Sequence, residues 1–357
     1  MTQTTLDDLL RAADVTQVHV NGPGQVFAVR DGRAERTDVR FRDGEHLLEV
    51  LRPLLPPGER AALEPPGGEF TLPDGTRMGV VLGPAAPFGP VVTFRCRRPR
   101  AAPLRELLAA RALTPEMALF LEAAVRAKLN VLLSCGNGAD GLPLLEALSH
   151  FVHANDRLVV VTDAGKWPVP HPTVTWIEMP PSDPVVVPPV PRRHLFRQAV
   201  AAVNMRPGRV LVTSSDAGEL HTVVRAATGG VSWITLIEAA GPQDAQFQVE
   251  VAATSGGTPT RLANVRKQLA GSLHLVAQID RLAGGACKVT RIDEAVAVGP
   301  ELLYHTLFRY RMTGVTAAGP AGRFEGTGIN PTFLDRLRSH GLRLPVNLFR
   351  ERTLAAD

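Results

Sequence analysis

Aromatic residues and lysine are both scarce in this sequence. Phe, Trp and Tyr together make up 5% of the chain, and lysine occurs only at positions 128, 166, 267 and 288. Proteins that bind nucleic acid combine clustered basic residues with aromatic side chains on which bases stack. The sequence shows neither feature, so the net charge of +4 indicates dispersed arginines in water or in ion pairs. We expect no nucleic-acid partner, and a nucleic-acid-binding module is an alternative that rests on the basic charge alone.

Cysteine clusters and long apolar runs are also absent. Cys96, Cys135 and Cys287 match neither a metal-ligand spacing nor a disulfide framework, and we expect reduced thiols. No run of 18 or more apolar residues exists that would predict a membrane-spanning helix. The first eleven residues lack the basic stretch and apolar core of a secretory signal. These absences predict a cytoplasmic protein that meets a membrane only through partners.

The composition is that of a globular protein, with 45% hydrophobic and 21% charged residues, and a length of 357 residues suggests two domains. Between residues 15 and 98, short extended runs alternate with turns such as Asn21-Gly22-Pro23-Gly24 and Pro73-Asp74-Gly75. Leucines at helical spacing interrupt this pattern at residues 44–52, and Asp43 is placed to cap that helix. The sequence therefore predicts an N-terminal α+β domain, residues 1–104.

A second domain is predicted for residues 105–357. Residues 97–103 contain three arginines and two prolines and favour a linker. Thr114-Pro115-Glu116 then has the order of a helix start: a hydroxyl cap, a proline and an acid. Apolar runs alternate with helical stretches, which predicts βαβ units in a mostly parallel sheet, with strands at 131–133, 158–161, 174–177, 210–212 and 234–237. The proline-rich segment 180–191 favours an extended surface loop.

A glycine-rich turn follows the first of these strands. Residues 135–143, CGNGADGLP, lead into an apolar helical run that ends at Phe151. Strand, glycine-rich turn and helix is the layout of a phosphate-binding loop. In such loops backbone N–H groups and the helix N-terminus hold phosphates, a lysine neutralises their charge, and a hydroxyl binds Mg²⁺. Here the lysine and the hydroxyl are missing.

Several long segments resemble one family, in order along nearly the whole chain. They are VHVNGPGQVFAVRDGRAERTDVRF, LTPEMALFLEAAVRAKLNVLLS, FRYRMTGV and GRFEGTGINPTFLDRLRSHGLRLPVNLF. The chain looks like the ATPases of type II and type IV secretion and pilus assembly, most of all the CpaF-like branch that drives Tad (Flp) pili. The resemblance implies that the second domain is a RecA-like domain of the P-loop NTPase type.

The resemblance also shows where the phosphate loop departs from the family. The first glycine of the family motif aligns with Cys135, the last glycine with Asp140, the lysine with Gly141 and the hydroxyl residue with Leu142. Asp140 would place a carboxylate where the helix dipole otherwise favours phosphate, and no lysine offsets the repulsion. The charge that the loop offers to phosphate is thus reversed relative to the family, because a carboxylate is present and the lysine is absent.

Other catalytic positions of the family have changed as well. Ser214 stands where the Walker B glutamate is expected, and an alcohol cannot act as a carboxylate base. Glu238 stands in place of the family's histidine, and a surface acid at a strand end is the simpler interpretation of it. The family's acidic pair aligns with Thr162-Asp163, so one acid remains.

The residues that the resemblance assigns to a nucleotide site form a loop group and an arginine group. The loop group is Gly136, Asn137, Gly138, Asp140, Gly141 and Leu142, together with Asp163. The arginine group consists of Arg95, Arg197 and Arg206, which match arginines that approach the nucleotide or a neighbouring subunit in the family. Surface or interface ion pairs are the simpler interpretation of these arginines.

Taken together, these residues predict a non-catalytic member of the family. Phosphoryl transfer depends on positioning and on charge stabilisation by lysine, metal and acid, and four such features are altered while the segments around them stay family-like. We expect no catalytic residue and no required cofactor or metal, although backbone amides still allow ATP or ADP with Mg²⁺ to bind. The expected partners are a homo- or hetero-oligomeric ring, commonly a hexamer in the family, with a related ATPase, and inner-membrane platform proteins. A divergent ATPase that binds nucleotide through Asn137, backbone amides and arginines is the alternative.

Overall fold

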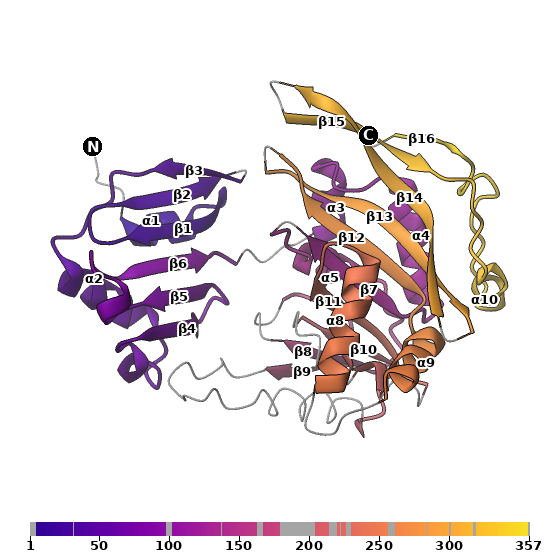
Figure 1. Ribbon diagram of the computed structural model, residues 1–357, viewed down its shortest axis with the longest axis horizontal. Helices are drawn as coiled ribbons and strands as arrows, with labels where there is room; N and C mark the ends of the chain where they lie inside the picture. The colour runs from indigo at the N-terminus through magenta and orange to yellow at the C-terminus, as the bar shows by residue number, and fades with distance from the viewer. Residues whose placement is uncertain are drawn as a thin grey trace. The chain divides into compact units, whose positions relative to one another are not determined.

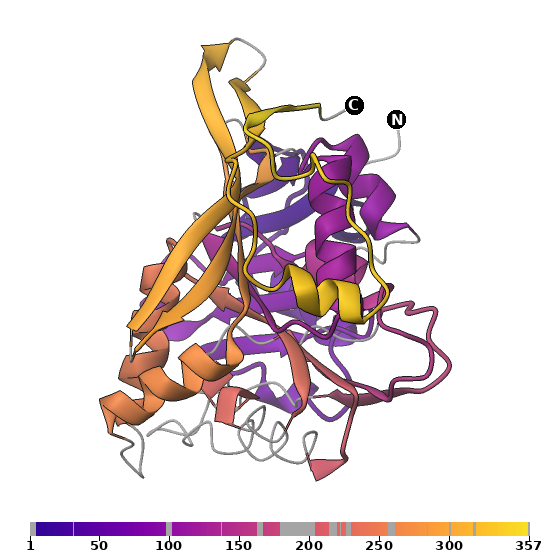
Figure 2. The same cartoon turned by 90° about the vertical axis from the view of Figure 1, so that its right-hand side faces the viewer.

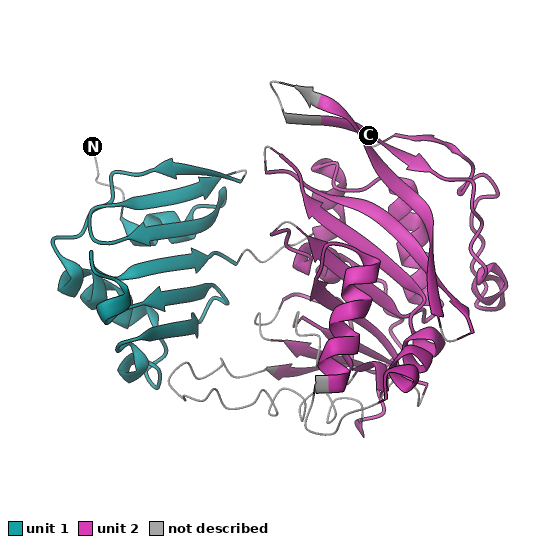
Figure 3. Ribbon diagram, viewed as in Figure 1, with its two compact units in different colours: residues 1–99, 163–166, 179–194 teal, residues 100–162, 167–178, 195–357 magenta. Residues whose placement is uncertain are grey.

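The computed structural model describes residues 5–30, 32–97, 102–136, 138–162, 167–178, 204–213, 220–221, 223–225, 230–255, 261–283, 285–299, 301–316 and 319–355. Figure 3 shows that the described residues form two compact units, one that includes residues up to Arg97 and one that includes residues from Ala102 onward. Each unit contains a β-sheet and a hydrophobic core of its own.

The first unit is an antiparallel sheet packed against short helices (Figure 1). Its sheet has the strand order β3-β2-β1-β6-β5-β4. The strands are β1 (Val15–Asn21), β2 (Val26–Arg30), β3 (Arg33–Arg36), β4 (Gly67–Thr71), β5 (Arg77–Val81) and β6 (Val91–Arg95), and the helices are α1 (Leu6–Arg11) and α2 (Gly44–Leu51).

Local signals in the sequence explain these elements. The Asp43 carboxylate accepts a hydrogen bond from the backbone N–H of His46 at 2.8 Å and so caps α2, which presents Leu47 and Leu51 to the core. In the turn between β4 and β5, the Asp74 carboxylate accepts the backbone N–H of Thr76 at 2.9 Å. The predicted α+β character of this region is confirmed.

The second unit contains a larger sheet with helices on both of its faces. Its strands are β7 (Val131–Gly136), β8 (Leu158–Thr162), β9 (Val174–Glu178), β10 (Arg209–Val212), β11 (Ser232–Glu238), β12 (Leu275–Arg281), β13 (Cys287–Val298), β14 (Glu301–Thr316), β15 (Gly319–Gly326) and β16 (Arg352–Leu354). Its helices include α3 (Pro103–Ala109), α4 (Pro115–Arg126), α5 (Leu142–Ser149), α8 (Pro242–Ser255), α9 (Leu262–Ser272) and α10 (Leu334–Ser339).

This sheet has a parallel half and an antiparallel half, in the order β16-β15-β14-β13-β12-β7-β11-β10-β8-β9. The pairings from β12 to β9 are parallel, and those from β12 to β16 are antiparallel. The strands predicted from apolar runs are confirmed as β7 to β11, and they all belong to the parallel half. The antiparallel half is an addition that the alternation of strands and helices did not predict.

Helices cover the parallel strands on both sides, which explains why β7 and β8 are buried along their whole length. Figures 1 and 2 show α4 and α5 on one face and α8 and α9 on the other. The predicted start of α4 is confirmed, because the Thr114 hydroxyl accepts the backbone N–H of Met117 at 3.3 Å and Pro115 occupies the first helical position.

None of the helices in the described ranges is both long enough and apolar enough to span a bilayer. The proline-rich segment 180–191, for which an extended loop was predicted, lies outside the described residues.

Candidate functional site

The glycine-rich turn lies at the carboxyl edge of the parallel half of the sheet. Strand β7 runs between β12 and β11, and the turn follows its carboxyl end and leads into α5 (Figure 1). In open α/β sheets, ligands bind outside the carboxyl ends of the strands. The turn therefore occupies the position at which a phosphate-binding loop is found.

The Asp140 side chain occupies the start of helix α5. Its carboxylate accepts a hydrogen bond from the backbone N–H of Leu142, the first residue of the helix, at 2.9 Å. This N–H is one of the groups that a helix N-terminus offers to an anion. An aspartate of the chain itself thus uses a donor that phosphate would need, and its negative charge is favoured there by the helix dipole.

Gly141, which aligns with the family's lysine, has no space for a side chain. A Cβ atom built on Gly141 would lie in close contact with Cys135 Sγ and 2.8 Å from Leu236 Cδ2, both buried atoms of the strands below. Real Cβ atoms essentially never approach another atom that closely. Leu142 also packs against the main hydrophobic cluster of the unit. Apolar packing therefore occupies the side of the loop on which a lysine would leave the backbone.

The changes at positions 135 and 141 compensate each other in volume. By the resemblance, the family has glycine at the position of Cys135 and lysine at the position of Gly141, whereas this chain has the larger residue first and glycine second. Because Cys135 Sγ fills the space beside Gly141, neither change is independent of the other. A lysine at position 141 requires a smaller residue at position 135.

Carboxylates surround the loop at the ends of neighbouring strands. Glu238 at the end of β11 is in register with Cys135, and Asp280 of β12 is in register with Gly136. Burial raises the pKa of the Cys135 thiol, and the negative charges of Asp140 and Glu238 raise it further. The thiol is therefore neutral at physiological pH.

Asp280 belongs to a hydrogen-bond network beneath the loop that the spacing of residues along the chain does not predict. Its carboxylate accepts from Gln278 Nε2 at 2.9 Å and from the Thr290 hydroxyl, and a Cβ on Gly136 would collide with it. The nearby Arg281 donates to the carbonyl oxygens of Gly138 at 3.2 Å and Gly285 at 2.9 Å. The sequence feature that could have indicated this network is the presence of polar residues at alternate positions at the end of a buried strand.

A Mg²⁺-nucleotide does not fit the described part of this site. Phosphates need a cation and free helix N–H groups, and Mg²⁺ needs a hydroxyl or carboxylate ligand beside them. The lysine position is closed at Gly141, the hydroxyl position holds Leu142, and Asp140 binds the first N–H of α5. In the part of the chain that the structure describes, no group of three or more His, Cys, Asp or Glu side chains is arranged to hold a metal ion.

The remaining predicted residues do not gather at this loop. Arg206 is exposed and precedes β10 by three positions, so it lies at the amino edge of the parallel strands, whereas the loop lies at their carboxyl edge. Arg206 therefore does not line the loop of its own chain. Arg95 is exposed at the end of β6 in the first unit, opposite Arg77. Several predicted positions lie outside the described residues, namely Asn137, Asp163, Arg197 and Ser214.

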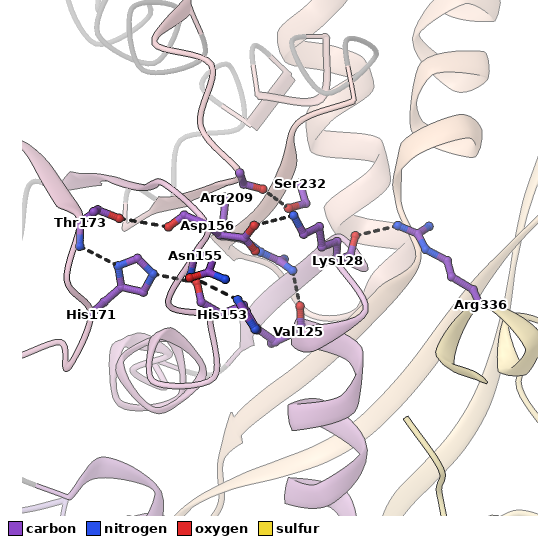
Figure 4. A network of polar contacts seen from close by, with 11 residues as sticks. Val125, Lys128, His153, Asn155, Asp156, His171, Thr173, Arg209, Ser232 and Arg336 are labelled. Carbon is purple, nitrogen blue, oxygen red and sulfur yellow. Dashed lines mark hydrogen bonds and ion pairs between the residues drawn. The ribbon is translucent and has the colours of Figure 1, made fainter. Parts of the chain in front are cut away.

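The amino edge of the sheet carries a buried polar network that supports α4 (Figure 4). Arg209 is 1% exposed and donates to the carbonyl oxygens of Val125 at 2.5 Å and Leu129 at 2.9 Å, just where α4 ends. Lys128 forms an ion pair with Asp156 at 2.6 Å. Orphan carbonyls at a helix end need donors, so this network holds the helix against the sheet.

Arg336 of helix α10 extends this network from the C-terminal segment. It donates to the Lys128 carbonyl oxygen at 2.8 Å, and its Nη1 lies 2.8 Å from His274 Nε2. Burial, followed by the charge of Arg336, lowers the pKa of His274 to about 4. His274 is thus uncharged at neutral pH. The C-terminal segment thus contributes a side chain to the polar network at the amino edge of the sheet.

Comparison with known proteins agrees with this architecture. The family described as type II/IV secretion system protein matches residues 2–312. A protein of Mycobacterium tuberculosis strain H37Rv that is named as a conjugal transfer protein is 27% identical over 295 residues, which are 80% of this chain and 82% of that protein.

Two solved structures share the fold. The ATPase DotB of Legionella pneumophila has a TM-score of 0.54 at 11% identity and covers 83% of this chain and 82% of its own. The pilus retraction motor PilT with bound ADP has a TM-score of 0.53 at 12% identity and covers 92% of this chain and 83% of its own. Identities this low concern the fold alone, whereas the family match spans most of the sequence. This chain belongs to the type II/IV secretion system protein family.

Proposed function

We propose that this chain is a non-catalytic member of its family, a structural or regulatory subunit of a pilus or secretion motor of the Tad (Flp) branch. One observation carries the proposal. The loop that should hold nucleotide phosphates is filled by the chain's own atoms, with Asp140 on the first N–H of α5 and with Cys135 and Leu236 against Gly141. A site closed in this way keeps the shape of the scaffold without needing a nucleotide.

The preserved scaffold supports a role in assembly. The buried network around Arg209 and the capped helix α4 place their polar groups with hydrogen-bond partners, so the unit offers a rigid scaffold on which a partner can assemble. We infer a ring with a competent ATPase relative, in contact with inner-membrane platform proteins on the cytoplasmic side. The proposed domains are residues 1–104 and 105–357.

Equilibrium binding of ATP, with and without Mg²⁺, tests the closed loop. We expect the purified natural chain to show no binding at about 1 mM ATP. A Kd of that size corresponds to a binding free energy of only about 4 kcal/mol. The restored variant carries Cys135→Gly, Asp140→Gly, Gly141→Lys and Leu142→Thr, and we expect it to gain affinity. The matched control omits Cys135→Gly, and we expect it to gain little, because Sγ still occupies the space beside position 141.

The outcomes separate the two functions. Tight ATP binding by the natural chain would mean that the loop has been rebuilt for nucleotide, and the divergent ATPase would replace this proposal. A restored variant that is folded by circular dichroism but gains nothing would contradict the argument that these four residues close the site. For the subunit role, tagged chain should co-purify with an ATPase relative or a platform protein, and recovery as a lone monomer contradicts it.

A further inference from the structure

An arginine cluster lies on one face of the antiparallel half of the second unit, remote in sequence from the phosphate loop. Arg309 and Arg311 are on β14 and Arg323 is on β15 (Figure 1 shows the two strands as a long ribbon). In the antiparallel register, Arg309 is opposite Glu325 and Arg311 is opposite Arg323. Residues directly opposite each other share a face, so these four side chains form one surface, here called the arginine cluster.

Glu325 organises the cluster but does not neutralise it. Its carboxylate accepts from Arg309 Nε at 2.9 Å and from Arg323 Nε at 2.8 Å, and Arg311 Nη1 is 3.9 Å away. These hydrogen bonds lower the pKa of Glu325, which is therefore ionised. Three guanidinium groups share one carboxylate, and two positive charges remain in excess.

The arginines are held in place while their outer nitrogens remain available. Both Arg309 and Arg323 use Nε to bind Glu325, and within the described part of the chain their Nη groups have no hydrogen-bond partner. The three side chains are 46%, 60% and 51% exposed in chain order, whereas Glu325 is 9% exposed. A pre-organised guanidinium loses less entropy on binding an anion than a free one does.

Two pairs of like charges face each other across the strands, and this arrangement is unfavourable without an anion. Arg311 is opposite Arg323, and Arg291 of β13 is opposite Arg309. Like charges directly opposite in a sheet are destabilising. Arg291 is compensated by the buried Asp293 at 2.9 Å, but in the described residues the pair of Arg311 and Arg323 has only the shared Glu325. An anion placed between them would remove the repulsion.

The geometry points to a carboxylate-rich segment of a partner protein as the occupant. We propose that such a segment binds the arginine cluster in extended form, with one carboxylate bridging Arg311 and Arg323 and another reaching Arg309. Arg309 and Arg311 are two positions apart on one strand, about 7 Å, which is also the spacing of alternate side chains in an extended peptide. Glu325 shows that the cluster accepts a carboxylate in this orientation.

Nucleic acid and a lipid surface suit this face less well. Nucleic-acid surfaces present aromatic side chains for stacking, but Tyr310 and Phe324 lie on the opposite face of the ribbon, where they pack against each other. Lipid-binding surfaces join basic residues to exposed apolar anchors. The exposed Met312 is adjacent to Arg311 in the strand and so points to the opposite face.

Fluorescence anisotropy with a labelled eight-residue peptide of alternating glutamate and threonine tests the proposal on the full chain. We expect binding that weakens as the salt concentration rises. In the double variant Arg311→Gln and Arg323→Gln the affinity for the peptide should fall by about tenfold or more. The charge-matched control is Arg33→Gln with Arg36→Gln, two exposed arginines of β3, and it should bind like the natural chain. A peptide of alternating glutamine and threonine should not bind.

A charge-conserving variant separates bidentate recognition from general attraction. Arg311→Lys with Arg323→Lys keeps both charges but removes the planar forks, and we expect about threefold or more weaker binding. Equal binding by this variant, or equal loss in the β3 control, would overturn the proposal. The proposal would also be overturned if the natural chain failed to bind the acidic peptide, whether or not it binds phosphatidylserine vesicles or a single-stranded DNA oligonucleotide.

Discussion

The substitution Gly141→Ala, which adds one methyl group, tests directly whether the phosphate loop is closed. Gly141 has φ −86° and ψ −11°, a conformation that alanine adopts without strain, and in open space Gly→Ala at such a position stabilises by about 0.4–1 kcal/mol through the unfolded chain. Here the new Cβ would meet Cys135 Sγ and Leu236 Cδ2. Overpacking in a rigid core costs about 1–3 kcal/mol. We therefore expect Gly141→Ala to destabilise the second unit by about 1–2 kcal/mol.

A double-mutant cycle with Cys135→Ala isolates the contact. Alanine is also a poorer helix cap than glycine, but that cost is the same in both backgrounds and cancels in the cycle. Because Cys135→Ala removes Sγ but leaves Leu236 Cδ2 in place, Gly141→Ala should cost less in that background, with a coupling energy of about 1 kcal/mol. Gly271→Ala in helix α9 is the matched control, since nothing lies within 4 Å of its Cβ position, and it should be neutral or stabilising.

Tryptophan fluorescence during urea denaturation is a suitable assay. Trp167, Trp176 and Trp233 belong to the second unit, so the signal reports the unit that contains the loop. If Gly141→Ala were neutral in both backgrounds, with a coupling energy below about 0.5 kcal/mol, the loop would have room for a side chain. The packing argument for a closed site would then be refuted.

Two further predictions concern the network at the amino edge of the sheet. Arg209→Met should lower the free energy of unfolding by about 2–4 kcal/mol, because the carbonyl oxygens of Val125 and Leu129 lose a buried donor. The stability of Arg209→Lys should lie between those of the natural chain and the methionine variant. An unchanged urea midpoint in the methionine variant would contradict the role of Arg209. His274 has a pKa of about 4 in the folded protein against 6.5 ordinarily, so the unfolded chain binds more protons between these values and stability falls as the pH decreases from 6.5 to 4. The loss between pH 7 and 5 should be about 2 kcal/mol at 1.36 kcal/mol per pH unit, and His274→Gln should show a correspondingly smaller pH dependence.

The elements of both units follow from local signals that the sequence displays. Asp43 predicts the start of α2, and Thr114-Pro115 predicts the start of α4, because a cap needs only a few adjacent residues. Apolar runs predict the strands of the parallel half, because strands covered on both faces are apolar throughout. The glycine-rich turn between β7 and α5 was located for the same local reason.

Prediction of the antiparallel half would require information that local sequence patterns do not contain. Strands β13 and β14 are half exposed and rich in polar residues, so no continuous apolar run marks them. The pairing of β12 with β7 places Asp280 beneath the phosphate loop, and the pairing of β14 with β15 places Arg323 opposite Arg311. Register between segments distant in sequence is set by the whole sheet, and neither contact can be derived from spacing along the chain.

The sequence by itself predicted that the lysine, the hydroxyl and the Walker B glutamate of a nucleotide site are replaced, because the resemblance compares residue identities at aligned positions. Only the tertiary structure decided how the replacements are accommodated. Cys135 fills the space that Gly141 leaves, and Asp140 binds the N–H of Leu142. Compensation of this kind depends on distances between atoms, and distances of a few tenths of an ångström decide whether a side chain fits in a close-packed interior.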